Sequence, residues 1–185
     1  MKNVDINKNA RLSEHLTSSS VAALGHSSEL DGSRVTPHFT LAEMCKTCVK
    51  TADGNIPSHV HIENLKRLCR WLERLRQKYN LNIKEKIKNK NDEPIIINSG
   101  YRSPQVNKAV GGAANSNHLT GCAVDIHVNG MEQLLRYAVI LLDIADEGRE
   151  DFDELLMERN AKGTYWLHFA VRPEGNRHKI VFLRV

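Results

Sequence analysis

The predicted strands of this chain come late and mostly one after another, while its two long helices lie before and between them. One amphipathic helix is predicted at 62–79, where apolar residues recur at helical spacing and charged residues occupy the other side. A second is predicted at 131–146. Runs of strands separated from runs of helices favour an α+β fold with a central antiparallel sheet flanked by helices.

Turn and capping residues mark the borders of these elements. Thr40 and Glu43 form a capping box, and Ser103 followed by Pro104 begins a short helix. Gly148 ends the second long helix, whose predicted buried side consists of Leu134, Leu135, Ala138, Leu141, Leu142 and Ala145. Strands are predicted at 94–98, 123–128, 152–158, 165–171 and 180–185, with a hairpin turn at 160–163.

The 185 residues correspond to one domain at 38–185 and an irregular or flexible N-terminal arm at 1–37, where Ser, Asn and Lys are frequent. The net charge of +4 is too small to indicate nucleic-acid binding by itself, and 5% aromatic residues argue against a stacking platform for single strands. The segment 84–92 is predicted to be a solvated loop, with a basic nucleic-acid patch as the less favoured interpretation. We therefore expect no nucleic-acid partner.

Neither a membrane-spanning helix nor a signal peptide is visible in the sequence. We expect a chain that is made in the cytoplasm and does not insert into a membrane, with a monomer favoured. Cys45 and Cys48 form a C-x-x-C pair, while Cys69 and Cys122 stand alone. Because a structural zinc site usually needs a second close pair, four reduced thiols are the simpler interpretation. A redox or metal role for the Cys45–Cys48 pair is the alternative.

Three polar residues fall where burial is costly. Asp125 lies in the middle of an apolar strand, and His118 lies in the loop before it, with Gly121 between them allowing a tight approach. His168 is a lone polar residue in the apolar segment 165–170. Two imidazoles and a carboxylate that converge are natural ligands for Zn²⁺, with one position left open. The alternative is a His118–Asp125 hydrogen bond with an unrelated core histidine.

A series of motifs then narrows the choice. In order they are Ser99-Gly-Tyr-Arg-Ser103, Asn107, Val110-Gly-Gly112, Ser116-x-His118-x-x-Gly121-x-Ala123-x-Asp125, Phe152-Asp153-x-Leu155 and Trp166-x-His168. Together they resemble the zinc D-Ala-D-Ala carboxypeptidase family, specifically its short C-terminal-domain branch in phage-related and cell-wall proteins. The resemblance covers about residues 39–183 and implies a hedgehog/DD-peptidase-like fold with the metal on the open side of the sheet.

The resemblance also implies roles for individual residues. His118, Asp125 and His168 would hold one Zn²⁺ per chain, with water at the fourth position. Arg102 would hold substrate or stabilise the oxyanion, and Ser116 would contact substrate. Both residues also have a structural alternative. Arg102 could instead anchor the strand-to-helix turn, and Ser116 could instead form a turn that stabilises its own loop.

The general base is where the sequence departs from the family. Several relatives carry Glu or His a few residues before the last histidine, and this chain has no carboxylate at 165–167. If Leu156 pairs with His168 in the hairpin, Glu158 opposes Trp166 and lies on the face of His168. Glu158 is therefore the predicted base. A one-residue change of register would turn it away.

Two further residues are alternatives for the base. Asp153 lies at the start of the same predicted strand, one register away from Glu158. His127 shares a strand face with Asp125, so it could sit at the rim of the site or support a ligand, or else be an exposed strand histidine.

The function predicted on this basis is a zinc-dependent peptidase. It would hydrolyse an amide bond of peptidoglycan stem peptides, as a D,D-carboxypeptidase or an endopeptidase of the endolysin type. The expected place of action is the cell wall or periplasm, reached by phage-lysin-like release or by an export route not visible in the sequence. The alternative is a catalytically inactive module that binds cell-wall peptide or zinc.

Overall fold

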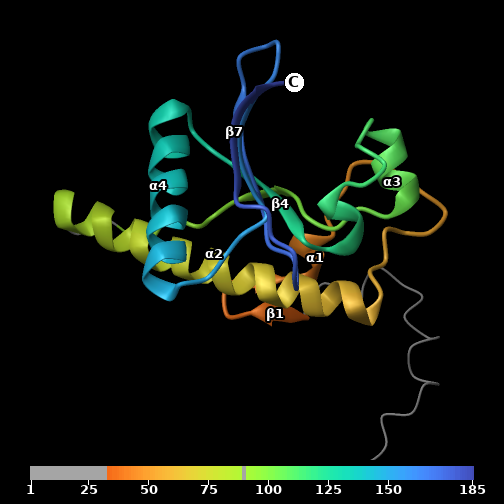
Figure 1. Ribbon diagram of the computed structural model, residues 1–185, viewed down its shortest axis with the longest axis horizontal. Coiled ribbons are helices and arrows are strands. Elements are labelled where there is room, and N and C mark those ends of the chain that lie inside the picture. The colour runs from red at the N-terminus through yellow and green to blue at the C-terminus, as the bar shows by residue number, and fades with distance from the viewer. Residues whose placement is uncertain (1–32, 89–90) are drawn as a thin grey trace, which may run out of the picture.

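A computed structural model describes residues 33–88 and 91–185 (Figure 1). They form a five-stranded sheet, a two-stranded sheet, two long helices and several short helical segments. In chain order these are β1 (Arg34–Thr36), β2 (Phe39–Thr40), α1 (Leu41–Met44), α2 (His59–Lys86), β3 (Ile97–Ser99), α3 (Pro104–Ala109), the 3-10 helix η1 (Asn117–Thr120), β4 (Ala123–His127), α4 (Met131–Gly148), β5 (Glu154–Arg159), β6 (Tyr165–Ala170) and β7 (Lys179–Arg184).

The main sheet has the strand order β3-β4-β6-β5-β7, and the predicted α+β class is confirmed. The pairs β3–β4, β4–β6 and β6–β5 are antiparallel, as expected. The prediction was wrong for the last strand, because β7 pairs with β5 in parallel. Both sides of β6 are already taken by β4 and β5. The chain leaving β6 therefore turns back outside β5, where it runs in the same direction as β5.

The hydrophobic core lies between one face of the main sheet and the helices α2 and α4. Leu65, Leu68 and Leu72 of α2 are fully buried there. Replacing one such leucine with alanine would cost about 2–5 kcal/mol of stability. Figure 1 shows α4 on one side of the sheet and α3 on the other. Since side chains alternate along a strand, the residues between the core-facing ones point to the face that α2 and α4 leave uncovered.

The helix α2 is longer than the sequence predicted. Ser58 caps its start through a capping box with His61, and the helix continues to Lys86. The solvated loop predicted at 84–92 is therefore wrong for its first residues. Ile83 extends the apolar face beyond the predicted end by packing against the core, and Lys84 Nζ lies 2.6 Å from Asp92 Oδ1.

The helix α4 begins at Met131, as predicted, and extends beyond the predicted end at Asp146 to include Gly148. Its buried side follows Leu134, Ala138, Leu141 and Ala145, but Leu135 is 48% exposed. The prediction for Leu135 was wrong because each residue turns the helix by about 100°, and Leu134 already points at the centre of the core. Leu135 instead lines a hollow of about 780 Å³ between α2 and α4.

The short helices α1 and α3 begin at the capping residues that the sequence predicted for them. Thr40 and Glu43 form the predicted capping box at α1, and Ser103 accepts a hydrogen bond from Val106 N–H at the start of α3. The strand predicted at 94–98 is shifted toward the C-terminus and corresponds to β3, Ile97–Ser99. No helix within the described ranges is both long and apolar enough to cross a membrane.

The predicted N-terminal arm, residues 1–37, lies mostly outside the described residues. Its end forms β1, which pairs with β2 and lies against α2. There Thr36 Oγ1 donates a hydrogen bond of 2.8 Å to Glu73 Oε1. The division between arm and domain stays a prediction.

Candidate metal centre

His118 is held by the short helix η1, which is stabilised at both ends. Ser116 Oγ accepts a 3.3 Å hydrogen bond from the backbone N–H of His118. Gly121 ends η1 with φ +70° and lies so close to α2 that a Cβ there would stand 2.7 Å from the carbonyl oxygen of His61. Nδ1 of His118 donates to the carbonyl oxygen of Gly100 at 2.6 Å. Because that proton is on Nδ1, the lone pair of Nε2 is left for the site.

Asp125 and His168 lie directly opposite each other on the antiparallel strands β4 and β6. They are 8% and 7% exposed, on the sheet face turned away from the core. Asp125 Oδ1 lies 2.9 Å from His168 Nδ1 and 3.3 Å from His118 Nε2. One ligand atom from each of the three residues lies within 4.8 Å of the others. Within the described part of the chain, this is the one group of His, Cys, Asp and Glu placed to hold a metal ion.

The contact between His118 and Asp125 is better satisfied by a cation than by a hydrogen bond. Burial lowers the pKa of His118, which favours the neutral ring. With its proton on Nδ1, the ring presents Nε2 as an acceptor, and Oδ1 of Asp125 is an acceptor as well. Two lone pairs therefore face each other across 3.3 Å. Zinc binds imidazole nitrogen and carboxylate oxygen at about 2.0–2.2 Å, so the donor set fits this metal.

His168 carries a proton in the metal-free protein. Burial alone would lower its pKa, but hydrogen bonds to Asp125 and Glu154 outweigh burial and raise the pKa of His168 to about 9. Burial would likewise raise the pKa of Asp125, whereas His118 and His168 hold it well below its usual range. The resulting imidazolium–carboxylate pair is electrically balanced. A metal ion bound by Nδ1 of His168 would replace this proton.

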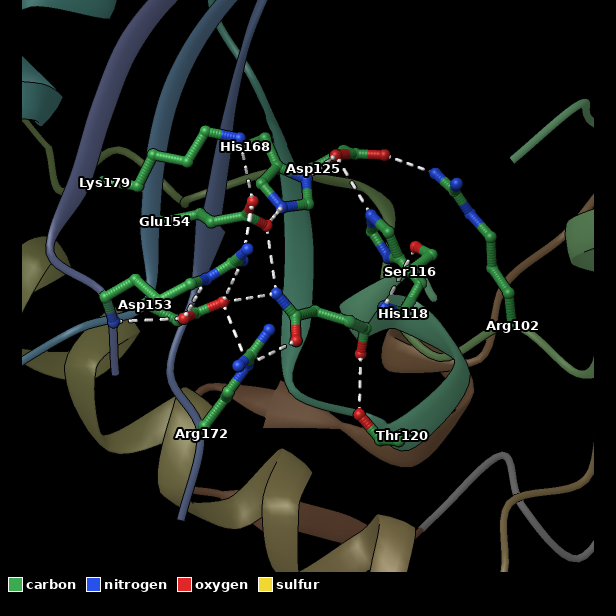
Figure 2. A network of polar contacts seen from close by, with 12 residues as sticks. Arg102, Ser116, His118, Thr120, Asp125, Asp153, Glu154, His168, Arg172 and Lys179 are labelled. Atoms are coloured by element: carbon green, nitrogen blue, oxygen red, sulfur yellow. Dashed lines mark hydrogen bonds and ion pairs between the residues drawn. The ribbon is translucent and has the colours of Figure 1, made fainter. Parts of the chain in front are cut away.

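Arg102 lies at the edge of the three ligands (Figure 2). Its Nη2 donates to Asp125 Oδ2, and its Nε donates to Ser99 Oγ at 2.8 Å. Ser99 ends β3, so these contacts tie the turn after β3 to β4, as the structural alternative predicted. A guanidinium has five N–H donors, and some of those of Arg102 are left for a substrate oxygen. The substrate role of Arg102 stays a prediction.

Glu158 is where the predicted register places it. Leu156 pairs with His168 and Glu158 pairs with Trp166, so Glu158 and His168 share one face of the sheet. Glu158 is half-buried, and burial raises its pKa. A carboxylate with a raised pKa beside the metal ligands has the properties of a general base near neutral pH. Its catalytic role stays a prediction.

The two alternative bases have other partners. Asp153 is fully buried and ion-paired to Arg172 and Arg177. His127 is half-buried on the Asp125 face of β4, where its Nε2 lies 3.2 Å from Asn129 Oδ1. Neither residue belongs to the group of three ligands.

A comparison with protein families adds an independent observation. A family model described as Peptidase M15 matches residues 37–141. The chain belongs to the peptidase M15 family. This confirms the resemblance found in the sequence motifs and makes the chain a member of a family of hydrolases. No curated protein matches the chain.

The match to the M15 family covers only part of the site. It includes Arg102, Ser116, His118 and Asp125, and it ends in α4. His168 and Glu158 lie beyond the matched residues, so their assignment to the site depends on the sheet register. The substrate role of Ser116 stays a prediction, since the contact seen is the cap of η1.

Glu154 of this M15 peptidase is a residue beside the site that the sequence did not single out. Its Oε2 lies 3.4 Å from His168 Nε2, and hydrogen bonding to His168 is the main cause that lowers the pKa of Glu154 to about 2. Strand parity could have found it, because positions 154, 156 and 158 share one face. The candidates for the base on this strand were Glu158 and Asp153, and Glu154, which shares the face of Glu158, was not among them.

The cysteines of this M15 peptidase are all free. Cys45 is buried, and burial raises the pKa of its thiol to about 12, while Cys48 is exposed. Cys45 and Cys48 are not part of any metal-binding group among the described residues. These observations agree with the interpretation of the cysteines as reduced thiols.

Proposed function

We propose that this M15 peptidase is a zinc-dependent enzyme that hydrolyses an amide bond in peptidoglycan stem peptides. It would act as a D,D-carboxypeptidase or as an endopeptidase of the endolysin type. The observation that carries the proposal is the convergence of His118, Asp125 and His168 in a chain of a peptidase family.

The three ligands would each offer one atom to the metal. His118 would bind through Nε2, His168 through Nδ1 and Asp125 through Oδ1, the atoms that approach one another in the structure. Two imidazoles and one carboxylate leave an open fourth position, which is the pattern of catalytic rather than structural zinc sites. When bound, zinc supplies a Lewis acid that activates water and polarises the scissile carbonyl.

The remaining chemistry falls to residues of the chain. Glu158 would take a proton from the attacking water and pass it to the leaving amine. Arg102 would hold a substrate carboxylate or stabilise negative charge on the carbonyl oxygen, because its guanidinium stands next to Asp125 with donors to spare. Ser116 would contact the substrate from the loop before η1.

The substrate class and place of action follow from the family resemblance. A stem peptide with a D-amino acid at the cleaved bond is the expected substrate. The net charge of +4 agrees with an anionic wall, though the charge is small. We propose that the enzyme works as a monomer at the cell wall or in the periplasm.

The test is to incubate the zinc-loaded protein with purified muropeptides and to identify the products by mass spectrometry. Loss of one terminal D-alanine from a pentapeptide would identify a carboxypeptidase. Cleavage of a cross-linked dimer into two monomers would identify an endopeptidase. A chelator should abolish either activity, and added zinc should restore it.

The same experiment separates the alternative function. A protein that binds zinc and muropeptides but cleaves neither substrate would be an inactive binding module. The absence of a carboxylate at 165–167, where relatives carry their base, is the feature that favours this alternative. A purified protein that binds neither zinc nor muropeptides would contradict both functions.

A further inference from the structure

A second carboxylate lies beside His168, on the side of the ring away from Asp125. Glu154, the first residue of β5, is two positions before Leu156, which pairs with His168. Glu154 and His168 are therefore diagonal neighbours on the same sheet face. Oε2 of Glu154 lies 3.4 Å from Nε2 of His168, and Nδ1 of the same ring lies 2.9 Å from Asp125 Oδ1. Figure 2 shows both carboxylates directed at the ring.

Nε2 of His168 depends on Glu154 for a partner. This nitrogen is buried, and within the described residues no atom makes a hydrogen bond of normal geometry to it. The distance of 3.4 Å between Nε2 of His168 and Oε2 of Glu154 is longer than an ordinary N–H···O hydrogen bond. It is nevertheless within the range of an ion pair, and Glu154 is the charged partner on this side of the ring. A buried ring N–H without an acceptor would be costly, so Glu154 is the acceptor for this proton.

We propose that Glu154 is a positioning residue that favours the Nε2–H form of the His168 ring, the form whose Nδ1 can bind the metal. A neutral histidine carries one ring proton, and its place is set by the partners of the two nitrogens. Without an acceptor at Nε2, the proton would move to Nδ1 and be donated to Asp125. That tautomer places a hydrogen where the metal must bind. The inference rests on the proposed zinc site.

Glu154 is itself held firmly in place. Its Oε1 lies 2.8 Å from Arg177 Nη2, and its Oε2 accepts a 2.9 Å hydrogen bond from Asn117 Nδ2. Lys179 Nζ lies 3.4 Å from Oε1. Arg177 and Asn117 also bind the fully buried Asp153, so the carboxylate belongs to a rigid network rather than to a mobile surface chain. Supporting groups of this kind orient the ligand and tune its affinity for the metal.

Zinc affinity provides the first test, measured by competition with a chromophoric chelator. Glu154→Leu removes the acceptor and should weaken zinc binding by about 10–100-fold. Glu154→Gln keeps an oxygen acceptor for the ring N–H and should bind within about threefold of the unchanged protein. Glu174→Leu serves as the control, because it removes an exposed carboxylate that belongs to none of the three ligands. Its affinity should not change.

The tautomer provides a second test that needs neither metal nor activity. Long-range ¹H–¹⁵N correlation spectra of the metal-free protein, recorded at a pH at which the His168 ring is neutral, give the share of rings that carry the proton on each nitrogen. The share of the Nε2–H form should be similar in the unchanged protein and in Glu154→Gln. Glu154→Leu should shift the population to the Nδ1–H form.

The outcomes separate this inference from the proposed function. If the unchanged protein binds no zinc, the zinc peptidase is contradicted, while the tautomer still decides the role of Glu154. If Glu154→Leu binds zinc with unchanged affinity, or has the same share of the Nε2–H form as the unchanged protein, the inference is overturned. Should Glu154→Leu fail to fold by circular dichroism, Glu154→Ala takes its place in both measurements and is judged by the same two outcomes.

Discussion

Asp125 uses its two oxygens for different partners. Oδ1 lies near both ligand histidines, while Oδ2 accepts from Arg102. A carboxylate buried in an apolar strand is stable only when it is paired, and here both oxygens have partners. Arg102 therefore stabilises the charge of Asp125 and also turns Oδ1 toward the histidines. The same residue can act on substrate only with the donors that this contact leaves over.

Metal content is the most direct test at the level of single residues. His118→Ala removes one of three ligands, so the purified variant should lose nearly all of its bound zinc, as measured by atomic emission. His59→Ala is the matched control, because His59 is exposed at the start of α2 and should leave the zinc content at one per chain. Zinc retained in full by His118→Ala would contradict the proposed centre.

The role of Glu158 can be separated from that of the ligands. Glu158→Gln keeps the size of the side chain but cannot accept a proton, so kcat should fall by about 10²–10⁴-fold. Zinc content should stay the same, because Glu158 is not one of the three ligands. Glu174→Gln should leave kcat unchanged. An unchanged kcat in Glu158→Gln would exclude Glu158 as the base and direct attention to another carboxylate.

The residues that the sequence predicted well are those whose burial needs a reason. Burying Asp125 and His168 in apolar strands costs free energy, so each residue could be singled out from its sequence neighbours alone. Glu154 could not be recognised in this way, since a Glu at the start of a strand is ordinary. Its importance comes from a diagonal contact across the hairpin and from partners far away in the sequence.

At the level of elements, the metal centre depends on short segments pressed against helices. Gly100 lies so close to α1 that a Cβ would stand 2.3 Å from the carbonyl oxygen of Met44. The carbonyl of Gly100 is also the acceptor for His118 Nδ1. Gly121 provides the corresponding close approach of η1 to α2. The position of His118 is therefore set by backbone contacts as well as by its own side chain.

Substitution of Gly121 tests this dependence. Gly121→Ala combines a left-handed backbone with a Cβ 2.7 Å from a backbone oxygen, so it should lower the free energy of unfolding by about 2–5 kcal/mol. Gly111→Ala is the control, because Gly111 has φ +72° but nothing within 4 Å of an added Cβ. It should cost about 1–2 kcal/mol. Equal losses in urea unfolding would mean that the close approach to α2 is unimportant.

The elements were predictable where local signals determine them. The capping box at α1, the hairpin register and the start of α4 depend on neighbouring residues, and the structure confirms them. The parallel pairing of β7 depends on which edges of the sheet are free, which is a property of the completed fold. The end of α2 depends on the packing of Ile83 against the core and on the ion pair between Lys84 and Asp92. No local pattern carries that information.

At the scale of the whole molecule, one buried carboxylate joins the end of the sheet to the loops around the site. Asp153 accepts hydrogen bonds from both Arg177 Nε and Nη2, at 2.8 and 2.7 Å. It also accepts from Asn117 Nδ2 at 2.7 Å, and Arg172 Nε lies 3.0 Å from it. These contacts connect β5, η1 and the turn between β6 and β7. Asp153 is thus a structural centre of the molecule, and its part in the reaction stays an alternative that the contacts do not require.

This network makes the stability of the molecule depend on pH. Burial would raise the pKa of Asp153, but hydrogen bonds from Arg177 and Asn117 outweigh it and lower the pKa below the ordinary value of 3.8. A carboxyl group with a lowered pKa in the folded state stabilises the protein above its unfolded pKa, and this stability is lost as the pH falls. Near neutral pH, Asp153→Asn should therefore reduce the free energy of unfolding by about 2 kcal/mol.

The difference between the unchanged protein and Asp153→Asn should shrink as the pH falls below about 4, because protonation then removes the charge of Asp153 in the unchanged protein as well. Urea unfolding in the presence of a chelator, at a series of pH values, measures this without a contribution from zinc. Asp151→Asn is the control: Asp151 pairs with His178 at the exposed surface and should change stability by less than about 1 kcal/mol. A loss for Asp153→Asn that stayed constant across this pH range would show that its charge does not contribute, and that packing alone explains its burial.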